Sequence, residues 1–120
     1  MEEQKTERRP WGSFTIIDEG PGFKVKRIEV NAGNRLSLQS HERREEYWTF
    51  VRGTGVFTVG EPNGDKLTQI HVSAGQQVKI PKRAKHRIEA LDDLAFIEVQ
   101  LGDGDESDIT RYEDDYGRAE

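Results

Sequence analysis

The chain has 120 residues, a formal net charge of -5 at pH 7 and no cysteine. That length suits a single domain over 1–120, which buries about two-thirds of its unfolded surface. The negative charge argues against nucleic acid as a partner. No apolar run reaches membrane-spanning length, and the N-terminus lacks a signal-peptide core. Disulfides and thiolate metal ligands are excluded, which fits a cytoplasmic protein.

The apolar content is low for a monomer with a dry core. Apolar residues make up 32% of the chain and charged residues 34%. A small barrel whose interior is partly a polar site tolerates this balance, and so does burial of an outer face in a dimer. We therefore expect a polar site inside the domain and a homodimer.

Short alternating or β-branched runs follow one another along the chain, with turn residues between them. We predict strands at 13–18, 23–30, 34–40, 46–52, 54–60, 67–72, 76–80, 85–90 and 94–101. Strands this short and numerous indicate an all-β sandwich or barrel. The segment 103–120 is acidic and poor in apolar residues, so its composition predicts a solvated or disordered tail.

Four polar residues are candidate metal ligands: Gln39, His41, Glu46 and His86. Gln39 and His41 lie two apart in an alternating stretch, so they share one face of a strand. Glu46 opens the next strand after a charged turn, and a hairpin there would bring it beside His41. Two imidazoles, a carboxylate and an amide oxygen in one pocket would bind a divalent metal, and these donors do not distinguish Zn, Mn, Co, Ni or Fe.

The glycines around these residues extend the pattern to two segments, 33–53 and 75–90. In the first, Gly33 precedes Gln39 by six residues and Gly53 follows Glu46 by seven. In the second, a proline stands six residues after Gly75 and a histidine five residues further on. Both halves resemble the signature of the cupin superfamily, with Gln39 at the first histidine position. The resemblance implies a jelly-roll barrel, the cupin double-stranded β-helix.

The glutamine at that position narrows the resemblance. The chain is similar to the cupin domain of type II mannose-6-phosphate isomerases, commonly the C-terminal part of a bifunctional guanylyltransferase/isomerase. Further matching stretches are 9–14, 23–28, 80–89 and 108–118, so the similarity covers about residues 8–118. It implies metal-dependent interconversion of mannose 6-phosphate and fructose 6-phosphate, a small sugar phosphate as the ligand, and a homodimer. These residues contain no nucleotidyltransferase domain, so guanylyl transfer is not carried over.

Three strand residues are candidates for the pocket. Lys26 shares a face with apolar neighbours and would be a buried cation that binds an anionic sugar phosphate, unless a bulge turns it outward. Arg35 shares its face with Gln39 and His41, which places it either at the pocket mouth or at a solvated strand end. Trp48 shares its face with Glu46 and would either wall the pocket or pack in the core.

The resemblance and the composition disagree about the tail. The match at 108–118 implies a folded closing element that carries Arg111 and Arg118, with Arg111 helping to form the isomerase pocket. Three apolar residues of this segment are spaced i, i+3 and i+7, which predicts a helical turn laid on the barrel. They are Ile109, Tyr112 and Tyr116.

The remaining basic residues and the third histidine have plainer interpretations. Arg43, Arg44, Lys82, Arg83 and Lys85 fall in predicted turns and are expected to be solvated. Arg83 replaces a glycine usual in the second cupin segment, which predicts a strained or rebuilt turn. His71 lies outside both segments and is expected to be exposed and without function.

Two rival functions fit the same residues. Two histidines and one carboxylate are also the ligands of non-haem iron oxygenases. A cupin that keeps its metal and loses its reaction would instead be a binding protein for a sugar phosphate or a sugar nucleotide. The sequence does not identify the general base that an isomerase needs.

Overall fold

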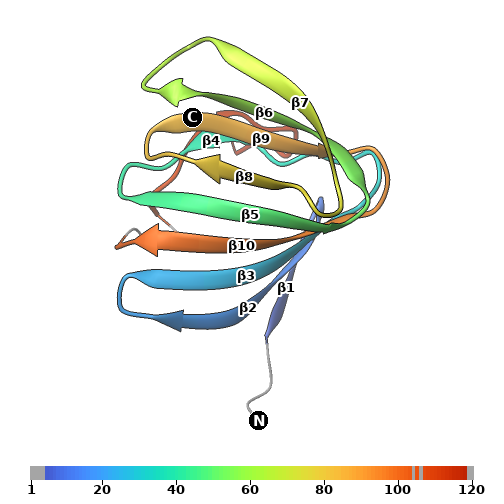
Figure 1. The fold of residues 1–120 in the computed structure, drawn as a ribbon, viewed down its shortest axis with the longest axis horizontal. Helices are drawn as coiled ribbons and strands as arrows, with labels where there is room; N and C mark the ends of the chain where they lie inside the picture. The colour runs from blue at the N-terminus through green and yellow to red at the C-terminus, as the bar shows by residue number, and fades with distance from the viewer. Residues whose placement is uncertain (1–4, 104, 106, 119–120) are drawn as a thin grey trace.

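A computed structural model describes residues 5–103, 105 and 107–118. Parts of the predicted domain 1–120 and of its acidic segment, namely 1–4, 104, 106 and 119–120, lie outside these residues. The described residues form no helix, so none of them builds a helix able to cross a membrane. Their strands are β1 (Thr6–Arg9), β2 (Gly12–Gly20), β3 (Phe23–Val30), β4 (Leu38–Ser40), β5 (Arg44–Arg52), β6 (Thr54–Pro62), β7 (Leu67–Ser73), β8 (Gln77–Ile80), β9 (Ala84–Ala90), β10 (Leu94–Gly102) and β11 (Thr110–Glu113) (Figure 1).

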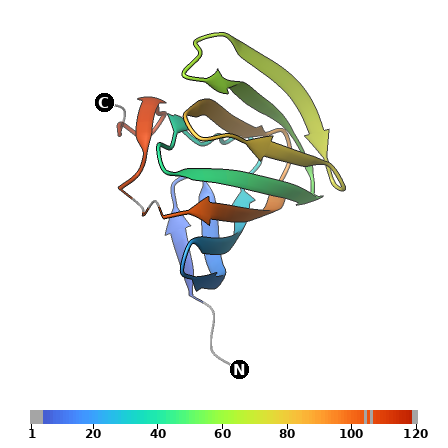
Figure 2. The same cartoon turned by 60° about the vertical axis from the view of Figure 1, so that its left-hand side comes forward.

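The strands pair in two antiparallel sheets that face each other as an open barrel (Figure 2). One sheet has the order β1-β2-β3-β10-β5-β8 and the other the order β11-β4-β9-β6-β7. Strands distant in sequence are neighbours, since β10 lies between β3 and β5, and β9 lies between β4 and β6. The expected all-β jelly roll is therefore confirmed.

The predicted strands are present, with two differences. The predicted strand 34–40 is paired regularly only at Leu38–Ser40, preceded by an isolated bridge between Arg35 and Glu89. β1 and β11 were not predicted from the sequence. Both lie at sheet edges, where pairing with an existing strand compensates for a polar sequence with few apolar side chains.

The hairpin predicted to join His41 to Glu46 is wrong. β4 pairs with β11 and β9, whereas β5 pairs with β10 and β8, so the two strands belong to opposite sheets. The turn between them crosses from one sheet to the other. His41 and Glu46 still meet, because their side chains point into the barrel from facing sheets.

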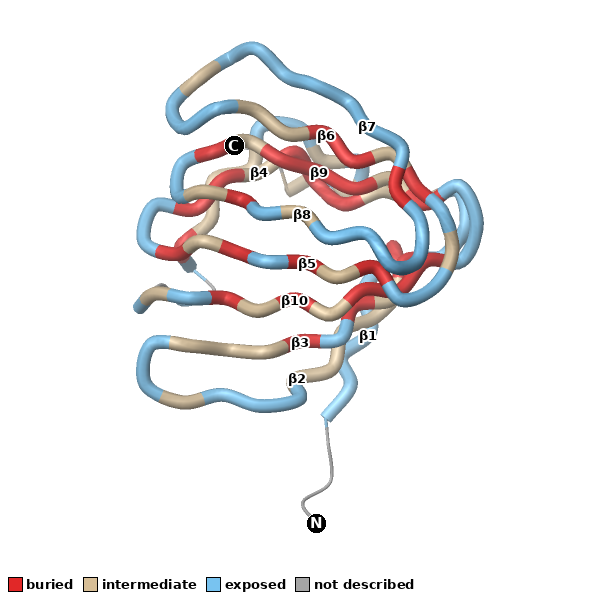
Figure 3. Tube along the Cα trace, in the orientation of Figure 1, coloured by how far each residue is buried: buried red, intermediate tan, exposed pale blue. Residues whose placement is uncertain are grey.

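An aromatic cluster fills the barrel core. The Trp48 ring stacks on Phe96 at 4.2 Å between centroids, and its edge meets Phe57 at 5.3 Å. Phe50 is fully buried beside them. Figure 3 shows buried positions alternating with less buried ones along β5, β9 and β10, as expected when one face of each strand looks inward.

The C-terminal segment is ordered where it is described, with the strand β11 at Thr110–Glu113 and a turn at 115–117, so both the disordered tail and the helical turn are wrong predictions. β11 pairs with β4 (Figure 2), and in the strand register Arg111 lies opposite Gln39. Its residues bond to the barrel: Tyr112 to the Ser40 hydroxyl at 2.8 Å, and Tyr116 to the Arg35 carbonyl at 3.2 Å. Edge pairing and these specific bonds stabilise a segment that composition alone marks as solvated, and the folded closing element is confirmed.

Backbone geometry explains two residues of the cupin segments. Gly53 has a φ of 83°, and a Cβ there would collide with the carbonyl oxygen of Asp93. Arg83 has a φ of 65°, the left-handed region that L-residues enter only at a cost. The strained turn predicted for Arg83 is present.

Candidate metal centre

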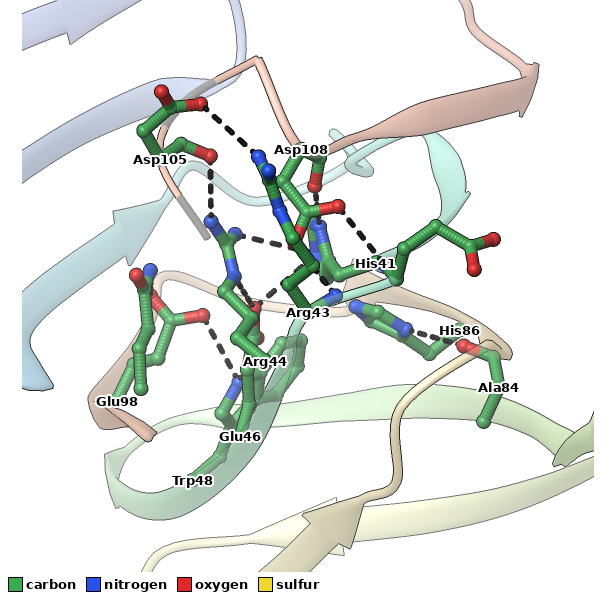
Figure 4. Close-up of polar contacts among 12 residues, drawn as sticks. His41, Arg43, Arg44, Glu46, Trp48, Ala84, His86, Glu98, Asp105 and Asp108 are labelled. Carbon is green, nitrogen blue, oxygen red and sulfur yellow. Dashed lines mark hydrogen bonds and ion pairs between the residues drawn. The ribbon is translucent and has the colours of Figure 1, made fainter. Parts of the chain in front are cut away.

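The side chains of His41, Glu46 and His86 converge inside the barrel (Figure 4). Their ligand atoms all lie within 4.8 Å of one another, and all three residues are buried. His41 directly follows β4, Glu46 lies on β5 and His86 on β9, so both sheets contribute. The structure thus brings together the three strongest ligand donors predicted from the sequence.

Backbone carbonyl groups fix the tautomer of both histidines. His41 Nδ1 lies 2.6 Å from the carbonyl oxygen of Asp108, and His86 Nδ1 lies 3.0 Å from that of Ala84. A carbonyl oxygen only accepts, so each Nδ1 carries the proton and each Nε2 keeps its lone pair. Burial is the main cause that lowers the pKa of His41 to about 3 and that of His86 to about 4. Both rings are therefore neutral, the form that binds metals.

The donor set fits a divalent metal ion. His41 Nε2 and Glu46 Oε2 are 3.2 Å apart, and two atoms bound to one ion at about 2.0–2.2 Å each lie at most about 4.4 Å apart. His86 Nε2 is buried and has no hydrogen-bond partner among the described residues, which is costly unless a ligand binds there. The three ligand atoms lie within 4.8 Å of one another, a few tenths of an ångström beyond the limit for atoms bound to one ion, so a bound ion would draw them slightly closer together. Nitrogen and oxygen donors of this kind suit Zn, Mn, Fe, Co or Ni.

Gln39, the fourth predicted ligand, lines the same cavity. In the strand register its Cα is opposite His86 on one side and Arg111 on the other. The amide therefore lies next to the centre, and its coordination of a metal remains a prediction.

Arg44 was expected to be solvated, and that prediction is wrong. Only 8% of its side chain is exposed; Nε donates to Glu46 Oε2 at 2.8 Å and Nη2 to His41 Nε2 at 3.3 Å. The physical reason is that β5 begins at residue 44, earlier than predicted, so Arg44 shares the inward face with Glu46 and Trp48. The spacing of two residues between Arg44, Glu46 and Trp48 was the sequence signal that could have predicted this position.

A cavity of about 130 Å³ is lined by His41 and Glu46 of the candidate metal ligands. Its lining includes the cations Arg9, Lys26, Arg44, Arg111 and Arg118, and the carboxyl groups of Glu46 and Glu98. Cations outnumber carboxyl groups, so the cavity favours an anionic ligand. Arg9 was not singled out as a site residue by the sequence, because a strand so close to the N-terminus was not predicted.

Lys26 and Arg111 both lie where a pocket role requires them. Lys26 is 5% exposed and lines the cavity, with its ammonium group 4.4 Å from the centre of the Phe14 ring. A bulge does interrupt the β2–β3 pairing, but it does not turn Lys26 outward. Arg111 reaches the cavity from β11. Their catalytic roles remain predictions.

The three residues predicted to bind substrate lie in different places. Trp48 lines the cavity and also packs in the core, so both of its interpretations hold. Arg118 lines the cavity while its guanidinium binds Asp114, with Nε 2.9 Å from Oδ2. Arg35 is not among the described residues that line the cavity, and it forms a bidentate ion pair with Asp115 at 2.7 and 2.9 Å. Its position is that of a clamp on the C-terminal segment.

Glu98 was missed by the sequence interpretation. It lies on β10 with 4% exposure, and Trp48 Nε1 donates both to Glu98 Oε1 at 3.2 Å and to Glu46 Oε1 at 3.0 Å. Burial first, and then the charge of Glu46, raise the pKa of Glu98 to about 8, against the opposing charges of Lys26 and Arg44. The cavity therefore contains a carboxyl group, Glu98, whose protonated form is favoured by burial and by the neighbouring Glu46.

Comparisons with known proteins give a family match over nearly the whole chain. The family model described as "Mannose-6-phosphate isomerase C-terminal" matches residues 1–114. Among curated proteins, the chain is 44% identical over 114 residues to "Alginate biosynthesis protein AlgA" of Pseudomonas syringae pv. tomato. It is 40% identical over 114 residues to "Mannose-1-phosphate guanylyltransferase ManC" of Salmonella typhimurium. Each alignment covers 92% of this chain and 22% of the relative, so the chain spans about a fifth of those proteins.

Solved structures with the same fold are less similar in sequence. The capsular polysaccharide assembling protein CapF from Staphylococcus aureus has a TM-score of 0.80 at 24% identity, over 91% of this chain and 32% of that one. A point mutant of Bacillus subtilis oxalate decarboxylase OxdC has a TM-score of 0.78 at 18% identity, over 91% of this chain and 30% of that one. At these identities the likeness supports the cupin fold alone.

Proposed function

We propose, since the chain belongs to the family described as mannose-6-phosphate isomerase C-terminal, that it is a metal-dependent sugar-phosphate isomerase. Its reaction would interconvert mannose 6-phosphate and fructose 6-phosphate. One observation carries the proposal: His41, Glu46 and His86 form a cluster of ligand donors, and His41 and Glu46 of this cluster line a cavity that has more cations than carboxyl groups. A metal ion and an anionic sugar would therefore meet in one place.

The isomerisation moves a proton between C1 and C2 of the sugar, and negative charge develops on the oxygens of an enediol-like intermediate. His41, Glu46 and His86 would hold the ion, with Gln39 beside them. A bound divalent ion supplies Lewis-acid stabilisation of charge on sugar oxygens. The histidines need not release a proton when an ion binds, because their pKa values lie near 3 and 4 and the rings are already neutral.

The cavity cations would bind the phosphate or the enediolate. Lys26 and Arg111 line the cavity from opposite sheets, β3 and β11. Charge-assisted hydrogen bonds from such groups are about twice as strong as neutral ones. Because Lys26 is buried, little water competes for its hydrogen bonds. Each such bond would therefore stabilise a bound anion more strongly. Trp48 and Arg118 would shape the wall around the sugar.

A coupled assay tests this proposal directly. The chelator-treated protein is assayed with mannose 6-phosphate, alone and after addition of Zn, Mn, Co, Ni or Fe. The proposal requires turnover that depends on one of these metals and disappears again with chelator. Absence of turnover with every metal would overturn the isomerase, and oxygen consumption with iron would instead support an oxygenase.

A second candidate function is binding of a sugar phosphate or sugar nucleotide without turnover. The observation that favours it is Arg44, which pairs with the buried Glu46 carboxylate at 2.8 Å. The charge of this carboxylate is thus compensated without a metal, and the cavity lining carries further cations that an anion could contact. Tight binding of mannose 6-phosphate by calorimetry, with no turnover, would support this function over the first.

The predicted homodimer also remains a proposal. Several large apolar side chains are exposed, among them Ile70 on the edge strand β7 at 42% and Val51 on β5 at 50%. Burial of such side chains against a second copy would compensate for the low apolar content. Light scattering at micromolar protein concentration should give the mass of a dimer, and a monomer would contradict it.

A further inference from the structure

Two hydrogen-bond acceptors face each other at the centre of the site. His41 Nε2 keeps its lone pair because Nδ1 carries the proton, and Glu46 Oε2 lies only 3.2 Å away. Two electron-rich atoms at this distance repel each other unless a positive group binds both. In the structure that group is Arg44, which donates to Glu46 Oε2 at 2.8 Å and to His41 Nε2 at 3.3 Å (Figure 4).

A metal ion at this centre needs the same atoms. An imidazole nitrogen has one lone pair, so His41 Nε2 cannot accept from Arg44 and ligate a metal at the same time. The charges also disfavour joint occupation, because a guanidinium and a divalent cation beside one buried carboxylate repel each other. Occupation by Arg44 and occupation by a metal are therefore mutually exclusive.

We propose that Arg44 is a built-in competitor of the metal ion: it occupies the centre in the metal-free protein and is displaced when the ion binds. This inference rests on the proposed metal site and adds a regulation to it. Glu46 is 1% exposed and would be an uncompensated buried charge if neither cation were present. Arg44 thus stabilises the empty barrel at the expense of metal affinity.

Arg44 has room beside the cavity when it is displaced. Arg44 already lines the cavity, and its other contact, from Nη1 to the carbonyl oxygen of Asp105, is long at 3.4 Å. A guanidinium released from His41 and Glu46 would remain beside the cavity and join Lys26 and Arg111 as a receptor for an anion. Metal entry would in this way free the Arg44 guanidinium, which already lines the cavity, to bind an anion.

Calorimetric metal titration tests the competition. The chelator-treated full chain is titrated with Mn²⁺ and, separately, Zn²⁺, as wild type, Arg44→Met and Arg43→Met. We expect Arg44→Met to bind the metals at least tenfold more tightly, because nothing then has to be displaced. Arg43→Met is the matched control, since this neighbour is 55% exposed and lies outside the cavity lining, and it should bind as wild type does.

Thermal unfolding provides a second readout that does not depend on titration enthalpy. Without metal, Arg44→Met should melt below wild type because Glu46 loses its partner, and saturating Mn²⁺ should raise its melting temperature more than it raises that of wild type. If Arg44→Met does not fold without metal, Arg44→Gln keeps a donor to Glu46 but no charge. It should show the same tightening.

The outcomes separate this inference from the proposed function. Metal affinity that is unchanged or weaker in both Arg44→Met and Arg44→Gln, while wild type binds metal and His41→Ala does not, overturns the competition and leaves the metal site intact. Absence of metal binding in wild type and in every variant overturns both. Tightening in the Arg44 variants with no change in Arg43→Met supports both.

Discussion

His41 donates a hydrogen bond from Nδ1 to the backbone carbonyl oxygen of Asp108, 2.6 Å away. The Asp108 carboxylate in turn accepts from the backbone N–H groups of Glu42 and Arg43, at 2.9 and 3.0 Å. One residue of the C-terminal segment therefore orients the first histidine ligand and also fixes the turn that follows it. Partners of this kind set the tautomer and the direction of a ligand.

Replacement of the Asp108 side chain should therefore weaken metal binding without removing a ligand. Asp108→Ala keeps the carbonyl oxygen but frees the turn at Glu42 and Arg43, so we expect a loss of roughly 10–100-fold in metal affinity. Calorimetry with Mn²⁺ measures it. Asp103→Ala, an exposed acidic residue of the same segment, is the control and should bind as wild type does. Equal affinities in the two variants would contradict the role given to Asp108.

The ligand histidines should be individually essential for stoichiometric metal binding. His41→Ala and His86→Ala each remove a nitrogen donor and little core volume, so the barrel should stay folded while elemental analysis shows less than one bound ion per chain. His71→Ala is the control, because His71 is exposed on β7. Full metal content in either ligand variant would show that the ion binds elsewhere.

Arg111 should be needed for turnover and not for metal binding. If it stabilises charge that develops on the sugar, Arg111→Ala should lower kcat by about 100-fold or more. Metal content should be unchanged, because Arg111 is not among the ligand donors. Arg27→Ala, at an exposed position of β3, serves as the control. Wild-type kcat in Arg111→Ala would exclude Arg111 from the reaction.

Buried titratable groups predict a stability maximum near pH 6.5 in the metal-free protein. His41 and His86 have folded pKa values of about 3 and about 4, below 6.5 for an unfolded chain. The unfolded state therefore binds more protons below pH 6.5, and stability is lost as the pH falls. Glu98 acts in the opposite sense, because its folded pKa of about 8 exceeds 4.5 in the unfolded chain, so its contribution is lost as the pH rises toward 8.

Urea unfolding at a series of pH values, with chelator present, measures this dependence. Between 4.5 and 6.5 the two histidines outweigh Glu98, so the free energy of unfolding should rise with pH. Between pH 6.5 and pH 8 only Glu98 contributes, so the free energy of unfolding should fall. Glu98→Gln should remove the fall, and His86→Gln should reduce the rise. A fall above pH 6.5 that persists in Glu98→Gln would assign it to another group.

The strained turn at Arg83 predicts a stabilising substitution. A non-glycine residue at positive φ destabilises the folded state by about 1–2 kcal/mol. Glycine removes this strain, but its greater freedom in the unfolded chain offsets part of the gain. Arg83→Gly should therefore raise the free energy of unfolding by about 0.5–1 kcal/mol while its backbone bonds to His41 and Asn63 persist. Asn63→Gly, at a φ of 60°, should gain less, since asparagine tolerates this region. Thermal unfolding compares the two, and destabilisation by Arg83→Gly would mean that the Arg83 side chain itself stabilises the turn.

The all-β fold and the three strongest ligands could be predicted from the amino-acid sequence. Strand periodicity is local, because alternation and turn residues depend on neighbours a few positions apart. The placement of Gln39 and His41 on one strand face follows the same local rule, whereas the hairpin expected to bring Glu46 beside His41 is not formed. His86 was reached only through the two-part glycine pattern, which records a long-range arrangement that periodicity cannot show.

Which side chains share the site depends on how the two sheets come together. Glu46 meets His41 across the two sheets and not through a hairpin, and Arg44 enters the centre because β5 starts before the predicted residue. The acidic C-terminal segment folds onto the barrel because β4 offers an unpaired edge to β11 and because Asp108 and Tyr116 form specific hydrogen bonds. These outcomes depend on hydrogen bonds and charge pairs between residues distant in sequence, and neither composition nor periodicity contains that information.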